Sequence, residues 1–435
     1  MKKLLTSVLS FVTFINICSA QHVSFEEYNL DNGLHVILHQ DNSAPVVTVS
    51  TFYHVGSKDE NPNRTGFAHF FEHLLFEGTQ NIPKGAWNKI ESANGGTGNA
   101  TTNQDRTYYY ESFPSNQTQL GLWMEAERMR HPIIGQVGVD TQNEVVKEEK
   151  RMRYDNAPYG QWTTQIFKNL FVKHPYRWTV IGSMEDLDAA TLDEFIAFNE
   201  KYYIPNNATL TVAGDINIPQ TKKWIEEYYG SIPKGAAIKR VKITEDPITE
   251  TIYATFEDPN IQIPAIFTAY RTPAMTDRDA YVLNMISSIL TDGKSSRLYK
   301  KLVDDKKKAL QVAAFNYSLE DYGAYIVLAL PLGKTTLDDL LTEMDEEIEK
   351  LQTELISERD YEKLQNIYEN DFVSANSSIS GIASSLAEYH VIYGDTDLIN
   401  KEIEIYRSIT REEIQEVAKK YLNKNQRLEL KYLPK

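Results

Sequence analysis

The chain has 435 residues, of which 41% are hydrophobic and 24% charged, and its formal net charge is −16. This length exceeds that of a usual single domain and predicts two domains. The acidic balance argues against nucleic acid, whose recognition calls for a basic patch, and against an anionic membrane surface. It is compatible with cationic or mixed peptides as ligands but identifies none.

The first 20 residues have the pattern of a secretory signal peptide. Lys2 and Lys3 precede a short apolar stretch, and small residues stand at positions 18 and 20. We expect cleavage after Ala20 and export to the periplasm or the medium. The apolar stretch is too short to span a bilayer comfortably, so we expect no membrane insertion.

Cysteine usage restricts the chemistry of any metal site. Cys18 is the only cysteine, and it lies in the predicted signal peptide. The mature chain would then have neither disulfides nor thiolate ligands. Any metal ion must be held by His, Asp or Glu side chains.

Strand-like and helix-like segments alternate through residues 21–232, the first predicted domain. A polar turn at 61–65 precedes a helix that Thr65 could cap. Residues 99–102 and 106–113 predict the two strands of a hairpin. Other strands are expected at 34–39, 46–53 and 206–214, and helices at 84–94, 117–130, 139–155, 185–203 and 218–229.

Residues 233–250 predict a linker, after which a similar pattern restarts in a second domain, 251–435. Strands are expected at 261–270, 322–331 and 427–432, and helices at 277–290, 335–353, 358–375, 379–392 and 410–421. Two α+β halves with similar element order indicate an ancient duplication.

The run Gly66–Phe76 contains His69, Glu72 and His73. Positions i, i+3 and i+4 share one face of a helix. The two imidazoles can therefore coordinate one metal ion, and the carboxylate between them can act as a base. The spacing H-x-x-E-H inverts the commoner zinc motif H-E-x-x-H. The alternative is a pair of ordinary helix histidines beside a solvated glutamate.

A catalytic zinc normally has three protein ligands, so a third is needed. Helical phase places Glu149 on the apolar face of its predicted helix, near Val145, Val146 and Met152, whereas Glu144 and Glu148 lie opposite, beside Lys147 and Arg151. A carboxylate on a buried face needs a partner, which a metal ion would supply. An arginine or backbone donors are the alternative partners. Gln142 shares this face and could support Glu149 through a hydrogen bond.

These residues together resemble the pitrilysin-type metallopeptidases, the family of insulin-degrading enzyme and the mitochondrial processing peptidase, in a short two-domain bacterial form. The resemblance covers nearly all of the mature chain. It rests on His69–Thr79 and Glu149, supported by residues 98–101, 105–109, 174–176, 181–182, 202–208 and 295–299.

The resemblance implies a fold of two similar halves, each a mixed, mostly antiparallel sheet with helices packed on it. It implies one Zn²⁺ per chain, held by His69, His73 and Glu149, with Glu72 as general base. It also implies that peptide substrate adds as a strand beside Asn99, Ala100 and Thr101.

Two departures from the family pattern bear on function. Gln142 stands where many relatives have a second carboxylate. Val303 and Leu310 stand where active single-chain relatives have an Arg and a Tyr that contact substrate, and neither can donate a hydrogen bond. We therefore expect the zinc-bearing subunit of a two-subunit peptidase, its homologous partner being a distinct chain or a second copy. The alternative is a non-catalytic structural or assembly subunit.

Overall fold

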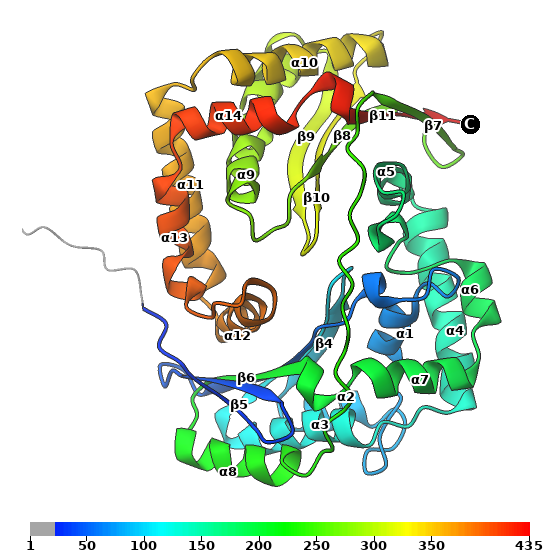
Figure 1. The fold of residues 1–435 in the computed structure, drawn as a ribbon, viewed down its shortest axis with the longest axis vertical. Helices are drawn as coiled ribbons and strands as arrows, with labels where there is room; N and C mark the ends of the chain where they lie inside the picture. Colours follow the sequence, from blue (N-terminus) through cyan, green and yellow to red (C-terminus); the bar gives the residue numbers. More distant parts are fainter. Residues whose placement is uncertain (1–21) are drawn as a thin grey trace, which may run out of the picture.

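The computed structural model describes residues 22–435, in two halves that each contain a β-sheet (Figure 1). The predicted signal peptide lies outside the described residues. Among the described residues, no helix combines the length and the apolar character that crossing a membrane requires.

The first half is built on a six-stranded sheet with the order β1-β2-β6-β3-β5-β4. Only β2 and β6 are parallel neighbours; the other pairs are antiparallel. All residues of the central strand β6 are buried, and β4 forms one edge. The strands are β1 (Glu26–Asn29), β2 (His35–Gln40), β3 (Val46–Tyr53), β4 (Thr97–Thr102), β5 (Thr107–Pro114) and β6 (Ala208–Gly214).

Helices of both halves surround this sheet. From the first half, α3 contacts β3 and β5, while α12 of the second half contacts β3 and β6 (Figure 1). The helices of the first half are α1 (Phe67–Leu74), α2 (Trp87–Ala93), α3 (Thr118–Arg130), α4 (Gln136–Lys150), α5 (Trp162–Leu170), α6 (Met184–Ala189), α7 (Leu192–Tyr202) and α8 (Ile218–Tyr229).

The second half repeats the strand topology of the first. Its sheet has the order β7-β11-β8-β10-β9, with β7 and β11 parallel, which matches β2-β6-β3-β5-β4. The predicted fold of two similar, mostly antiparallel halves is therefore confirmed. Its elements are β7 (Ile252–Asp258), β8 (Ala265–Thr272), α9 (Arg278–Thr291), β9 (Ala309–Ser318), β10 (Gly323–Pro331), α10 (Leu337–Thr353), α11 (Glu358–Ala375), α12 (Ile379–Glu388), α13 (Leu398–Ser408), α14 (Arg411–Tyr421) and β11 (Arg427–Pro434).

Several elements differ from the sequence-based expectations. The helix expected over 185–203 is two helices, because the backbone is extended at Ala190 and Thr191 starts α7 with a capping box. Thr65 does not cap α1: Gly66 holds the cap position, and the Thr65 hydroxyl donates to Asp186 at 2.5 Å. Five further elements were not expected from the sequence, namely β1, α5, β7, β9 and α13.

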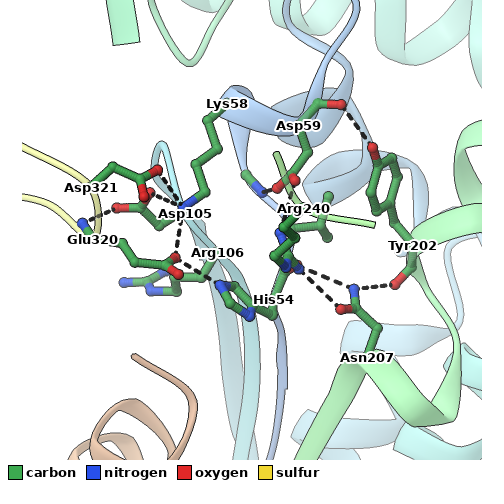
Figure 2. Close-up of polar contacts among 12 residues, drawn as sticks. His54, Lys58, Asp59, Asp105, Arg106, Tyr202, Asn207, Arg240, Glu320 and Asp321 are labelled. Carbon is green, nitrogen blue, oxygen red and sulfur yellow. Dashed lines mark hydrogen bonds and ion pairs between the residues drawn. The ribbon is translucent and has the colours of Figure 1, made fainter. Parts of the chain in front are cut away.

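A buried cation joins the two halves at the turn between β4 and β5. Lys58 Nζ lies 2.9 Å from Asp105 Oδ1 in the first half, 2.7 Å from Glu320 and 3.1 Å from Asp321 in the second (Figure 2). His54 Nε2 also contacts Glu320, at 2.7 Å. Three carboxylates around one lysine therefore fix the β4–β5 turn against the loop between β9 and β10.

The segment between α8 and β7, which contains the predicted linker, has no helix or strand. It is bound to the first half by Arg240, which pairs with Asp59 at 2.8 Å and donates to the His54 carbonyl and to Asn207 (Figure 2). In addition, α5 packs on the second sheet, where Trp162 stacks on Phe267. The halves are thus connected by packing as well as by chain continuity.

Candidate metal centre and active site

Helix α1 is anchored so that its polar residues face away from the core. Phe67, Phe70, Phe71 and Leu74 are buried, and the Tyr109 hydroxyl donates to the Phe71 carbonyl at 2.7 Å. These apolar positions follow the 3.6-residue period, which leaves His69, Glu72 and His73 on the opposite face.

The start of α1 is shaped by a glycine and a buried carboxylate. Gly66 has φ +95°, and a Cβ there would lie 2.7 Å from the Ile181 carbonyl oxygen, so only glycine fits. The Glu60 carboxylate accepts hydrogen bonds from the amides of Gly66 (2.9 Å) and Ala68 (2.8 Å). A carboxylate at a helix N-terminus also complements the helix dipole.

The three predicted metal ligands come together in the structure. Glu149 Oε2 lies 3.5 Å from His69 Nε2 and 3.3 Å from His73 Nε2. Tetrahedral zinc with bonds of about 2.0–2.2 Å places donor atoms about 3.3–3.6 Å apart. The donor set of two imidazoles and one carboxylate, with these separations, fits a zinc ion.

Glu149 reaches α1 because α4 packs one stripe of its surface against that helix. Val139 and Val146 are the buried residues of α4, and Glu149 follows Val146 by three positions. The expectation of a wider apolar face was wrong, since Val145 and Met152 are exposed. Glu149 therefore lies at the end of a narrow stripe.

Glu144 and Glu148 of α4 pair with basic side chains on the face opposite Glu149, as helical phase predicted. Glu144 pairs with Lys147 and Glu148 with Arg151, each at 3.0 Å and near the surface. Glu149 itself has two kinds of partner: its Oε1 pairs with the exposed Arg153 at 2.8 Å, while Oε2 faces the histidines.

The electrostatics of the cluster favour metal-binding protonation states. Burial, followed by the nearby His73, lowers the pKa of His69 to about 4, so this ring is neutral at pH 7. The hydrogen bond with His73 holds the pKa of Glu149 below its usual value against the effect of burial. A neutral imidazole and an ionised carboxylate both present lone pairs to a cation.

Glu72 lies beside the predicted substrate strand. Glu72 and His73 line a cavity of about 240 Å³ together with Gly98 and Asn99 of β4. Burial raises the pKa of Glu72. The carboxyl group of the predicted base and the edge strand therefore open onto the same space.

The exposed edge of β4 has no neighbour among the described strands. Asn99 and Thr101 are exposed and Ala100 is buried, so side chains alternate as in a half-buried strand. Arg106, which the sequence reasoning did not single out, donates to the Thr101 carbonyl at 2.8 Å. The Thr101 carbonyl, near the β4–β5 turn, therefore already accepts a hydrogen bond from a side chain of this chain.

Gln142 does not bond to Glu149, contrary to expectation. Its amide donates to Glu77 Oε1 at 2.6 Å, and Glu77 also pairs with Lys84. Gln142 thus helps attach α4 to the segment after α1, and any influence on the metal remains a prediction.

Val303 and Leu310 lie away from the cavity beside Glu72. Val303 packs against the core of the second half, and Leu310 is exposed near the start of β9. The other end of β9, Ser318, leads into the loop that contacts Lys58. Leu310 and Ser318 are eight residues apart, which corresponds to about 27 Å along a strand at roughly 3.4 Å per residue. Leu310 therefore lies at the end of β9 remote from that loop.

Comparison with known families gives two matches that together cover most of the chain. Residues 35–181 match the family described as "Insulinase (Peptidase family M16)" and residues 189–368 match the "Peptidase M16 inactive domain". The zinc protease PqqE of Helicobacter pylori is 31% identical over 400 residues, which are 89% of this chain and 90% of that protein.

Solved structures show the same architecture. The crystal structure of a protease from Helicobacter pylori matches 95% of this chain and 100% of its own, with a TM-score of 0.90 and 29% identity. The periplasmic protease PqqL from Escherichia coli matches 94% of this chain but only 48% of its own, with a TM-score of 0.78 and 18% identity. That likeness is one of fold, and this chain spans about half of PqqL.

Proposed function

Because the chain belongs to the insulinase family of peptidases (M16), we propose that it is a zinc-dependent endopeptidase or oligopeptidase. The observation that carries this proposal is the convergence of His69, His73 and Glu149 next to a cavity that Glu72 shares with β4. The similarity to a protein named as a zinc protease supports the same activity.

The proposed mechanism assigns one task to each part of the site. His69, His73 and Glu149 would hold the zinc ion, which supplies a Lewis acid that acidifies a water molecule and polarises the scissile carbonyl. Glu72 accepts the proton of the attacking water and passes it to the leaving amine nitrogen. Its burial-raised pKa suits a group that must both take up and release a proton.

Substrate binding falls to the edge of β4. A peptide that adds as a strand beside Asn99 and Ala100 would place its backbone next to Glu72. Main-chain pairing recognises an extended backbone and tolerates many side chains. We therefore assign short or unfolded peptides as substrates, because a folded protein cannot offer a free strand.

We place this activity outside the cytoplasm. The signal-peptide pattern of residues 1–20 supports export, and the structural neighbour PqqL is named as periplasmic. The acidic composition sets no further restriction on the compartment.

We further propose that the chain is the zinc-bearing subunit of a two-subunit enzyme. PqqL is about twice as long as this chain, which matches one half of it. Val303 and Leu310 cannot donate hydrogen bonds to a substrate carbonyl, and neither lines the cavity at Glu72. A homologous partner would supply the missing Arg and Tyr.

The alternative, a non-catalytic assembly subunit, has less support. Two comparisons favour it: the "inactive domain" description of the match over residues 189–368, and a structure of a "peptidase M16 inactive domain" from Pseudomonas fluorescens, a likeness of fold at 16% identity. Against it, the three polar residues of the inverted zinc motif and the third ligand are all present, and a subunit without chemistry does not need them.

A peptidase assay tests the proposal. The chain is purified alone and from its native source with any bound partner, then incubated with an unstructured fluorogenic peptide. We expect cleavage that a chelator abolishes and Zn²⁺ restores, and a faster rate with the partner. The absence of cleavage in both preparations would contradict the enzymatic proposal, and equal rates would contradict the need for a partner.

A further inference from the structure

A second cluster of two histidines and a glutamate lies where the two halves meet at β1 and β2. Glu27 is on β1, His35 on β2, and His390 on the single π-helical turn (Tyr389–Tyr393) that follows α12. Glu27 Oε2 lies 3.2 Å from His35 Nε2 and 3.8 Å from His390 Nδ1. Three elements, two from the first half and one from the second, thus bring donor atoms within 4.8 Å of one another.

This cluster has the same donor set as the zinc centre proposed above, with a different arrangement of the rings, which are stacked here and nearly perpendicular there. Both contain two imidazoles and one carboxylate, and one carboxylate oxygen faces both rings in each. The oxygen-to-nitrogen distances are 3.2 and 3.8 Å here and 3.5 and 3.3 Å there. Both sets lie close to the separations of about 3.3–3.6 Å expected around tetrahedral zinc.

His35 lies between two acceptors, and a neutral ring can donate a hydrogen bond to only one of them. In the tautomer whose Nδ1 donates to Asn29 Oδ1, 3.0 Å away, Nδ1 carries the hydrogen. In the neutral ring Nε2 then has a lone pair, which points at the Glu27 carboxylate. Metal-binding histidines are held in the same way, with the second nitrogen donating to an acceptor.

A hydrogen bond orients the carboxylate. The Thr396 hydroxyl donates to Glu27 Oε2 at 2.7 Å, and its oxygen lies 3.4 Å from His390 Nδ1.

We propose that Glu27, His35 and His390 bind a second Zn²⁺ ion, which fastens the outer strands of the first sheet to the second half. Imidazole nitrogens and a carboxylate suit Zn²⁺ among the common divalent ions. The two rings are stacked, with centroids 3.5 Å apart and planes 3° from parallel. Because imidazole lone pairs lie in the ring planes, binding requires one ring to rotate out of the stack, and we assign this rotation to His390, whose side chain is 32% exposed against 12% for His35.

The role of this ion is structural and independent of peptidase activity. Its three ligands come from strands and a helix end that do not line the cavity at Glu72. An ion that joins two halves stabilises the folded state by mass action, because the unfolded chain has no preformed site. The halves are also joined by the linker and by the Lys58 cluster, that is, Lys58 with Asp105, Glu320 and Asp321. The ion would add a further point of attachment.

Zinc content and thermal stability test the site in a chain whose proposed catalytic centre is disabled. The His69→Ala/His73→Ala variant, dialysed exhaustively after loading with Zn²⁺, is expected to retain one zinc per chain. Adding His390→Gln or His35→Gln should remove that ion. The melting temperature should rise with Zn²⁺ in the first variant and not in the triple variants.

His131→Gln is the matched control. His131 pairs with Glu127 at 3.3 Å but is not part of a three-ligand group among the described residues. Adding it to the double variant should leave the retained zinc unchanged. Absence of bound zinc in the double variant, or zinc retained in the triple variants, would overturn the proposal. Neither result bears on the peptidase proposal, which is measured by cleavage in the otherwise intact chain.

Discussion

The Nε2 atom of His73 lies 3.3 Å from the Oε2 atom of Glu149, a residue of a different helix. This contact makes Glu149 the third ligand of the proposed centre. The Glu149→Gln variant should lose zinc affinity by more than the roughly 10- to 100-fold typical of losing an outer-shell partner, because a neutral amide replaces a charged ligand. The measurement is a competition titration with a chromogenic chelator, in a His390→Gln background that removes the second cluster.

Glu148→Gln is the control for this titration. Glu148 is the neighbouring carboxylate on α4, but it is exposed and pairs with Arg151. The zinc affinity of this variant should equal that of the parent chain. Equal affinities of the two variants would rule out Glu149 as a ligand.

Strand addition to β4 predicts sensitivity to backbone methylation. A peptide substrate methylated at an amide that pairs with the edge should lose about 10-fold in kcat/KM, since one hydrogen bond is worth about 1 kcal/mol and the methyl group also clashes. A scan of single N-methyl substitutions along one peptide should show this loss at alternating positions. A uniform response along the peptide would contradict pairing with the edge strand.

The Lys58 cluster predicts that stability depends on pH through Asp321. Burial alone would raise the pKa of Asp321, but His174 and Lys58 outweigh it and lower the pKa from its usual 3.8 to about 2. A lowered pKa means that the ionised group stabilises the folded state above pH 4 and that this contribution is lost as the pH falls toward 2.

The Asp321→Asn variant should therefore be less stable at pH 7 by about 1 kcal/mol, a value reduced from the full shift because water screens this partly exposed group. Urea unfolding at pH 7, 4 and 3 measures the difference, which should shrink as the pH falls. Asp338→Asn is the control, because Asp338 pairs with Lys431 but is largely exposed. A difference that grows toward pH 3 would show that the pKa of Asp321 is not lowered in the folded chain.

We predict that removing the Glu60 carboxylate, which caps α1, lowers the free energy of unfolding. Glu60→Ala leaves the amides of Gly66 and Ala68 without their acceptor, and each such buried group costs about 1–3 kcal/mol. We expect the free energy of unfolding to fall by about 2 kcal/mol or more in urea titrations. Glu227→Ala, at an exposed carboxylate of α8, should change it little; equal effects would show that Glu60 has no special role.

Local patterns were enough to locate the candidate site. The spacing of His69, Glu72 and His73 placed them on one face of α1, and helical phase selected Glu149 over Glu144 and Glu148. Both inferences depend on the period of a single helix. The alternation in residues 99–113 likewise gave the hairpin of β4 and β5.

Contacts between residues far apart in the sequence could not be predicted from local patterns. Gln142 has the right phase for Glu149 but bonds to Glu77, which only the packing of α4 reveals. Lys58 meets Glu320, and Glu27 meets His390, across the boundary between halves. The strand β9 was missed because its burial alternates only weakly, and α5 because its apolar face is covered by the other half.

The central claim is that Glu72 moves the proton in a zinc peptidase centre. The most direct test compares the wild-type and Glu72→Gln chains, each with any native partner, by cleavage of an unstructured peptide and by zinc content in the same samples. We predict equal zinc and a rate lower by about 10²–10⁴-fold in the variant, the usual contribution of a general base. Cleavage by the variant at the wild-type rate would contradict this role of Glu72.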